Sequence, residues 1–164
     1  MDATRPQAPL TALLIAPDRE LAGRFTATLG RSRAFQVLAD IKTYPAQQVL
    51  DMRLRQVRPH VLLLDVATDM QRAAEVIGMA AGRNVPVACL HHTNDPDAIV
   101  TTLRLGAAEF LCEPFEPEVQ EQARARIARI LGPEPEPERD PGQVLAFTSA
   151  KPGAGASTLA TQVA

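Results

Sequence analysis

The sequence has 164 residues, with 17 lysines and arginines against 19 aspartates and glutamates, a formal net charge of -2 and 46% hydrophobic residues. A charge this close to zero gives no electrostatic reason for non-specific binding of nucleic acid or of an anionic membrane through the bulk surface. Its two cysteines, Cys89 and Cys112, are too few for a disulfide scaffold or a cysteine-based zinc site, which favours a reducing cytoplasm.

Short apolar runs alternate with amphipathic segments along residues 10–131. Unbroken apolar runs of four to seven residues are typical of strands buried on both faces of a parallel sheet. Between the runs, apolar residues recur every three or four positions, as at Leu21, Phe25 and Leu29, and so share one helix face. Five strands alternating with five helices predict an α/β fold with a doubly wound, flavodoxin-like parallel sheet. The predicted strands are residues 10–16, 35–39, 61–64, 85–90 and 109–112.

Proline alternates with glutamate in residues 132–142. Proline blocks regular helix and sheet, and the glutamates repel one another, so we predict an extended, solvated linker there. This boundary divides the chain into an N-terminal tail (1–9), a first domain (10–131), the linker (132–142) and the start of a second domain (143–164).

Two carboxylates stand where predicted strands end. Asp18 follows the first strand and Asp65 ends the third. Ligands of doubly wound sheets bind at the carboxyl ends of the strands, so we expect both side chains to face one crevice, where they are weak candidates for holding magnesium. A simpler reading is that each caps the following helix.

Residues 10–131 resemble a response-regulator receiver domain. The resemblance rests on Leu14–Asp18, Arg58–Asp65, Val85–Val87 and, most specifically, Gly106–Phe115. It implies that Asp65 stands at the phosphoacceptor position and Asp18 at one of two magnesium-binding acidic positions.

Three positions depart from the receiver pattern. Pro17 replaces the second acidic residue, His91 the hydroxyl residue of the fourth strand and Glu113 the lysine of the fifth. Magnesium would lose an oxygen ligand, and a phosphoryl group on Asp65 would face a negative charge. We therefore predict a degenerate receiver used for docking or dimerisation. The alternative is a receiver that is phosphorylated at Asp65 by a histidine kinase, with an unusual activation relay.

The segment after the linker combines an apolar run, residues 144–149, with a glycine-rich loop, residues 150–156, that leads into a helix start. Backbone N–H groups converge on an anion in such a loop, so the pattern predicts a phosphate site. Ala150 and Ala156 depart from the standard P-loop, which has glycine and lysine there. The alternative is a glycine-rich linker that binds nothing.

An early lysine, Lys151, resembles the deviant loop of the ParA/MinD ATPases, although Pro152 stands where glycine is usual. The resemblance implies nucleotide binding by the residues listed at the end of this paragraph, and ATP with magnesium as the cofactor of the full-length protein. Ser157 would contact the magnesium if the ATPase domain is complete. No cofactor is expected in the first domain. No catalytic residue is assigned in the ATPase domain, because Ala164 falls inside its presumed first helix. The implied nucleotide-binding residues are Lys151, Gly153, Gly155, Ser157 and Thr158.

A receiver-like domain followed by such a loop is most similar to the CpaE/TadZ proteins of Flp (tight adherence) pilus assembly. The resemblance implies a localisation and self-association module that forms a homodimer and contacts the pilus secretion machinery, without direct nucleic-acid binding. No apolar run approaches the roughly 18 residues of a membrane span, so we expect a cytoplasmic protein. The resemblance further implies a location at the cell pole or at the inner face of the cytoplasmic membrane. The rival functions are a response regulator with a ParA-like output domain and an active partitioning ATPase.

Overall fold

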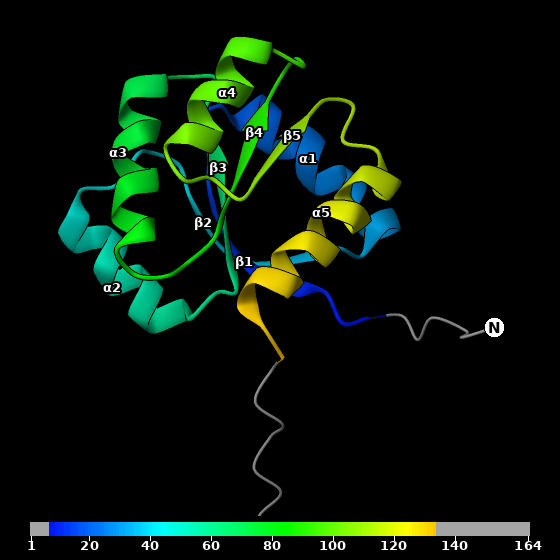
Figure 1. Ribbon diagram of the computed structural model, residues 1–164, viewed down its shortest axis with the longest axis horizontal. Helices are drawn as coiled ribbons and strands as arrows, with labels where there is room; N and C mark the ends of the chain where they lie inside the picture. The colour runs from blue at the N-terminus through cyan, green and yellow to red at the C-terminus, as the bar shows by residue number, and fades with distance from the viewer. Residues whose placement is uncertain (1–6, 134–164) are drawn as a thin grey trace, which may run out of the picture. The chain divides into compact units, whose positions relative to one another are not determined.

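A computed structural model describes residues 7–133, so the predicted nucleotide-binding residues Lys151, Gly153, Gly155, Ser157 and Thr158 lie outside the described residues. The described residues confirm the predicted doubly wound, five-stranded parallel sheet, with strand order β2-β1-β3-β4-β5 (Figure 1). The elements are β1 Leu10–Ile15, α1 Arg19–Ser32, β2 Phe35–Ile41, α2 Gln47–Val57, β3 Val61–Asp65, α3 Met70–Ala81, β4 Val87–His91, α4 Pro96–Arg104, β5 Glu109–Cys112 and α5 Pro117–Leu131.

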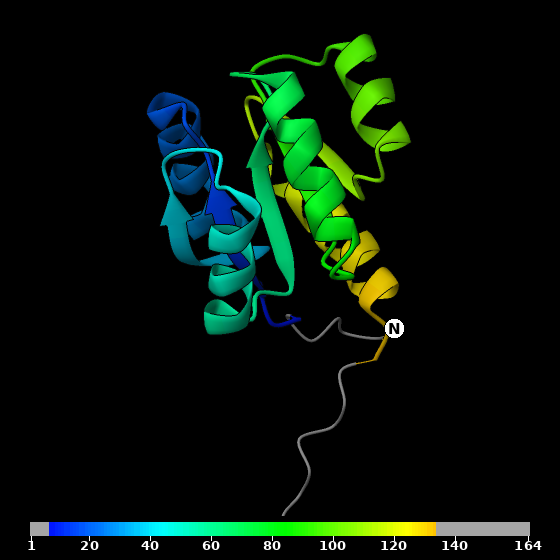
Figure 2. The ribbon, with the colours of Figure 1, turned by 90° about the vertical axis from the view of Figure 1, so that its left-hand side faces the viewer.

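Helices cover both faces of the sheet (Figures 1 and 2). A hydrophobic core lies between the sheet and the helices on each face. On one face, Phe25 of α1 and Ile127 of α5 pack among apolar residues of β1 and β3. On the other, Leu50 of α2 and Ile77 of α3 pack against alternate residues of the same strands. All five residues of β3 are buried, because this strand lies at the centre of the sheet. The unbroken apolar runs of the sequence reflect this double burial.

The outer strands differ from the predicted ranges. β4 begins at Val87 and not at Val85, because Pro86 has no N–H to donate to the ladder. The Val85 N–H instead donates to Ala80 O at the end of α3. β2 extends to Ile41, two residues beyond its apolar run, because exposed and half-buried residues alternate along this edge strand.

A β-bulge interrupts the pairing of β2 with β1. Ala12 pairs with Val37 and Leu13 with Ala39, so Leu38 has no partner residue and its side chain is 47% exposed. The extra residue lets Val37 face one core and Ala39 the other. A bulge of this kind bends and twists an edge strand.

Aspartates begin three of the helices. Asp18 caps α1, Asp69 accepts a hydrogen bond from Arg72 N of α3, and Asp95 accepts two from the first turn of α4. Pro96 follows at the first position of α4, where its missing N–H costs no hydrogen bond. Within residues 7–133, no helix combines the length and apolar character that crossing a bilayer requires.

Candidate functional site

Asp65 lies at the carboxyl end of β3 and is fully buried. Its Oδ1 accepts hydrogen bonds from Ala67 N (2.8 Å) and Thr68 N (3.2 Å). Its Oδ2 accepts one from the Thr68 hydroxyl (2.6 Å) and one from Asp18 N (3.2 Å). Four protein donors therefore satisfy the lone pairs of this carboxylate.

Asp18 lies beside Asp65, as the sequence predicts, and caps α1. Its Oδ1 accepts hydrogen bonds from Glu20 N (2.9 Å) and Leu21 N (3.1 Å). Its Oδ2 lies 2.8 Å from His92 Nε2. The hydrogen bond from Leu21 N, with further contributions from His92 and Glu20 N, lowers the pKa of Asp18. Both carboxylate oxygens are thus in use within the domain.

His92 bridges two carboxylates across the crevice. Its Nδ1 lies 2.8 Å from Glu113 Oε1, on the side of the ring opposite Asp18. The hydrogen bond to Glu113, followed by that to Asp18, raises the pKa of His92. Protonated, the imidazolium donates to both partners and supplies one positive charge between two negative ones.

Glu113 is also paired with an arginine. Arg24 Nη1 of α1 donates to Glu113 Oε2 (2.7 Å), and the same guanidinium pairs with Glu20 one turn earlier. Burial favours a higher pKa for Glu113, but the hydrogen bonds from Arg24 and His92 outweigh it and lower that pKa. Two cationic side chains therefore face Glu113, a pairing that the sequence does not predict.

The neighbouring His91 takes no part in this chain of contacts. Its ring lies 5.7 Å from that of Phe110 on β5, and its Nδ1 lies 3.0 Å from Thr93 O. The two adjacent histidines thus contact different groups, in line with their opposite orientations at a strand end.

The crevice does not suit magnesium. This ion prefers six oxygen ligands in an octahedral arrangement. The oxygens of Asp65 and Asp18 are already occupied by protein donors, and Pro17 offers no carboxylate. Among residues 7–133, no three or more His, Cys, Asp or Glu side chains are arranged to hold a metal ion.

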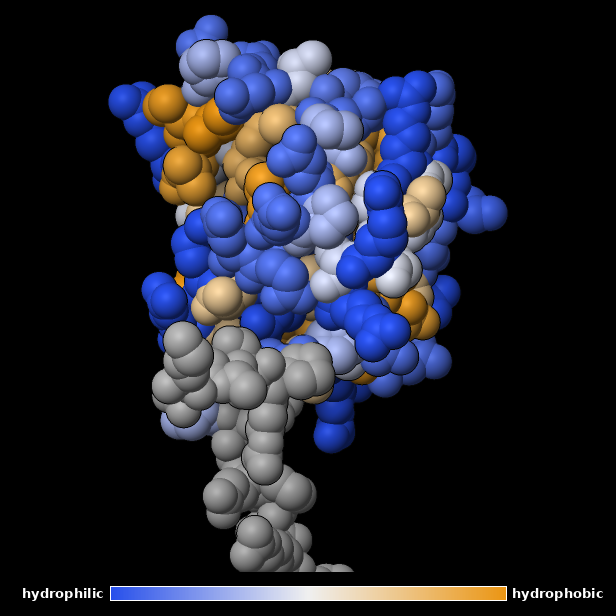
Figure 3. Space-filling model, turned by 90° about the vertical axis from the view of Figure 1, so that its right-hand side faces the viewer, coloured by the Kyte–Doolittle hydropathy of each residue, from blue (hydrophilic) through white to orange (hydrophobic). Residues whose placement is uncertain are grey.

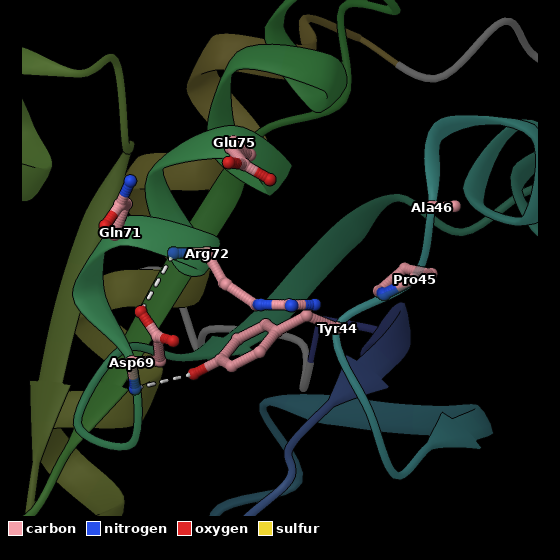
Figure 4. A pocket seen from close by; sticks show the side chains of 7 residues that line it. All are labelled: Tyr44, Pro45, Ala46, Asp69, Gln71, Arg72 and Glu75. Carbon is pink, nitrogen blue, oxygen red and sulfur yellow. Dashed lines mark hydrogen bonds between the residues drawn. The ribbon is translucent and has the colours of Figure 1, made fainter.

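A polar cavity of about 580 Å³ opens between the β2–α2 segment and the first turns of α3 (Figure 4). The Tyr44 hydroxyl donates to Asp65 O (2.9 Å) and accepts from Asp69 N (3.2 Å). Burial, together with the nearby charge of Asp65, raises the pKa of Tyr44 to about 12, so its hydroxyl stays protonated. Tyr44 therefore connects the loop after β2 to the end of β3 and to the loop that precedes α3. The lining residues are Tyr44, Pro45, Ala46, Asp69, Gln71, Arg72 and Glu75.

No protein-family model and no curated protein sequence matches the chain, but solved structures share its fold. The signal receiver domain of a modulated diguanylate cyclase from Desulfovibrio desulfuricans superposes with a TM-score of 0.59 at 17% identity, covering 75% of this chain and 97% of that one. A protein from Burkholderia thailandensis described as the pilus assembly protein CpaE superposes with a TM-score of 0.59 at 14% identity, covering 73% and 98%. A pilus assembly-related protein from Burkholderia pseudomallei gives a TM-score of 0.57 at 15% identity, covering 73% and 92%.

Residues 10–131 have the receiver fold. Within it, Asp18 and Asp65 lie together as the sequence predicts, whereas Arg24, Tyr44 and Thr68 were not anticipated as members of the site. Thr68 follows Asp65 by three residues, a spacing at which a hydroxyl can reach back to a turn-forming aspartate. Arg24 reaches Glu113, which is 89 residues away in sequence, so only the fold reveals that pair.

The His92 bridge should make stability depend on pH. The lowered pKa values of Asp18 and Glu113 add stability that is lost as the pH falls below about 4. The raised pKa of His92 adds stability that is complete below about pH 6.5 and is lost as the pH rises through the raised value. We expect His92→Gln to lose up to about 1 kcal/mol below about pH 6.5, and progressively less as the pH rises through the raised pKa of His92.

Thermal unfolding from about pH 5 to about pH 9 measures this difference. The matched control is His91→Gln, which removes a histidine outside the bridge and should leave the pH profile of the wild-type chain unchanged. Parallel profiles of wild type and His92→Gln would show that the bridge does not titrate as described.

Proposed function

We propose that the first domain is a degenerate receiver that serves as a docking and self-association module of a pilus assembly protein of the CpaE/TadZ type. Residues 143–164 would begin its ATPase domain, with Lys151 as the signature lysine. One observation carries the proposal: Asp65 is saturated by protein hydrogen bonds, while His92 and Arg24 occupy the cationic places of the crevice. The fold shared with two pilus assembly proteins supports the cellular setting.

The contacts of Asp65 oppose its phosphorylation. A carboxylate oxygen that attacks a phosphoryl donor must first give up its hydrogen bonds, and at Asp65 every strong acceptor position is used. The transferred phosphoryl group also needs cations around its three oxygens. Two cationic side chains lie in this crevice, and both are already paired. Arg24 pairs with Glu113, and His92 contacts both Glu113 and Asp18.

We therefore expect no mass increase when the 164-residue chain is incubated with acetyl phosphate and magnesium and analysed by intact-mass spectrometry. Asp65→Asn is the control for site specificity, because it removes the nucleophile and keeps the side-chain shape. A phosphoryl group added to the wild-type chain and absent from Asp65→Asn would overturn the proposal in favour of a phosphorylated response regulator.

Helix α4 provides a surface for self-association. Val100 and Leu103 on α4 and Leu105 at its end are 46%, 47% and 40% exposed. Figure 3 shows hydrophobic side chains gathered at the upper left of the face that it presents, on the side of the molecule where α4 lies. Aliphatic residues clustered on one helix face favour burial against a partner.

We expect sedimentation analysis of the 164-residue chain to show a dimer that Leu103→Glu converts into a monomer, because a charge cannot be buried unpaired. The matched control is Met52→Glu on α2, which changes a side chain of similar exposure (57%) elsewhere on the domain. A dimer that survives Leu103→Glu, or one abolished equally by Met52→Glu, would place self-association elsewhere.

A further inference from the structure

The near-neutral net charge conceals a separation of charge along the domain. Each helix of a doubly wound sheet runs back against the strands, so all five helices end at the amino edge of the sheet. Six exposed arginines lie in the last turns of these helices or just after them, and none forms an ion pair within residues 7–133. We call this set the basic end: Arg31, Arg33, Arg55, Arg58, Arg104 and Arg129.

Two members of the basic end, Arg33 and Arg58, lie close to the start of β1. Arg33 precedes Ala34, whose carbonyl accepts a hydrogen bond from Leu10 N at the start of β1 (3.0 Å). Arg58 lies two residues before His60, whose N–H donates to Thr11 O of the same strand (2.8 Å). These contacts place both arginines at one end of β1, although α1 and α2 cover opposite faces of the sheet.

Helix stability alone does not account for these two arginines. A cation near a helix C-terminus interacts favourably with the helix dipole, but Arg31 and Arg55 already supply one in the last turns of α1 and α2. Arg33 and Arg58 are the C-cap residues of α1 and α2. Both have the left-handed backbone conformation, with φ of 52° and 48°. Glycine is the favoured residue for this conformation, so arginine is kept there at a conformational cost.

Within residues 7–133, two acids lie on α2 and at the start of β5, and both are already paired. Asp51 pairs with Arg83 and Glu109 with Arg126, so neither is free to neutralise the basic end. Ile130, at the end of α5, is 62% exposed. Leu131, the last residue of the same helix, is 39% exposed. Large aliphatic side chains therefore stand among the unpaired arginines.

We propose that the basic end docks on the surface of an anionic lipid bilayer. Arginines contact the lipid phosphates, and the aliphatic side chains enter the interfacial layer. A nucleic acid backbone would use the arginines but leave Ile130 and its neighbours without an apolar partner. The proposal goes beyond what net charge indicates, because the fold gathers six arginines at one end of the described residues. It is independent of whether Asp65 is phosphorylated.

Flotation of the full 164-residue chain with vesicles tests the proposal. We expect binding to vesicles that contain phosphatidylglycerol, weakening as salt is raised, and none to vesicles of phosphatidylcholine alone. Arg33→Gln with Arg58→Gln should weaken binding by about 25-fold, about fivefold for each arginine. The matched control, Lys42→Gln with Arg72→Gln, removes two exposed cations at the opposite end of the sheet and should leave binding unchanged.

Glycine variants separate docking from folding. Arg33→Gly with Arg58→Gly should weaken vesicle binding to the same extent and leave the melting temperature equal or higher, because glycine relieves the left-handed backbone. Equal binding to both kinds of vesicle would overturn the proposal. So would arginine variants that bind no worse than the control pair, or binding to duplex DNA but not to anionic vesicles.

Discussion

Asp65→Ala is expected to destabilise the domain by about 2–4 kcal/mol. The change removes the acceptor for four donors: three backbone N–H groups, of Ala67, Thr68 and Asp18, and the Thr68 hydroxyl. Hydrogen bonds to a charged group contribute more than neutral ones, and the donors become unpaired beside a fully buried position. Chemical denaturation of the 164-residue chain, followed by circular dichroism, measures the loss.

The control for this experiment is Asp69→Ala, which removes an aspartate with one backbone contact at the start of α3. It should cost about 1 kcal/mol, the usual value for loss of a helix cap. If Asp65→Ala cost no more than this control, Asp65 would be a solvated acid of an open site and not a structural member of the crevice. The comparison thus tests whether the Asp65 carboxylate stabilises the fold.

Phe25→Ala should cost about 3–5 kcal/mol, the range for removing a buried phenylalanine. Phe25 is fully buried, and its ring packs edge to face with Phe115 at a centroid distance of 5.2 Å and against Phe35 at 6.4 Å. Deleting the ring removes these contacts and leaves a cavity between α1 and the residues that precede α5. Phe25→Leu, which keeps most of the volume, should cost much less.

The same substitution should also loosen the crevice. Arg24 precedes Phe25 on α1 and pairs with Glu113, two residues before Phe115. Loss of packing at Phe25 should let Arg24 and Glu113 move apart and so weaken the contact of His92 with Glu113. Phe25→Ala should therefore lose the pH dependence of stability described for the wild-type chain. A Phe25→Ala domain with an intact pH profile would show that the core and the crevice are not coupled.

The buried centre of the fold could be predicted from sequence because both faces of its strands are covered. β3 has an apolar run with no polar break before Asp65, and this signal has few other interpretations. β2 is harder to delimit, because its edge position gives an alternating pattern and Leu38 shifts that pattern at the bulge. The start of β4 was misplaced at Val85, because an apolar run does not show which N–H groups pair.

The candidate site could be predicted only where its residues follow strands directly. Asp18 and Asp65 were found by that rule. His92 also follows a strand directly, at the end of β4, but its partners could not be predicted. The contacts of His92 and Arg24 with Glu113 join different elements, and nothing in the local sequence around either residue indicates them. Side-chain pairs between distant segments are set by tertiary packing, which periodicity does not encode.

The bulge at Leu38 limits how copies of this domain can assemble. An exposed edge strand offers unpaired backbone groups to a strand from another molecule, and a bulge in that edge breaks the run of groups that such a strand would need. Growth of the sheet across molecules is thereby discouraged at β2. On this side of the domain, contacts between copies are therefore left to helical surfaces, where single substitutions can tune them.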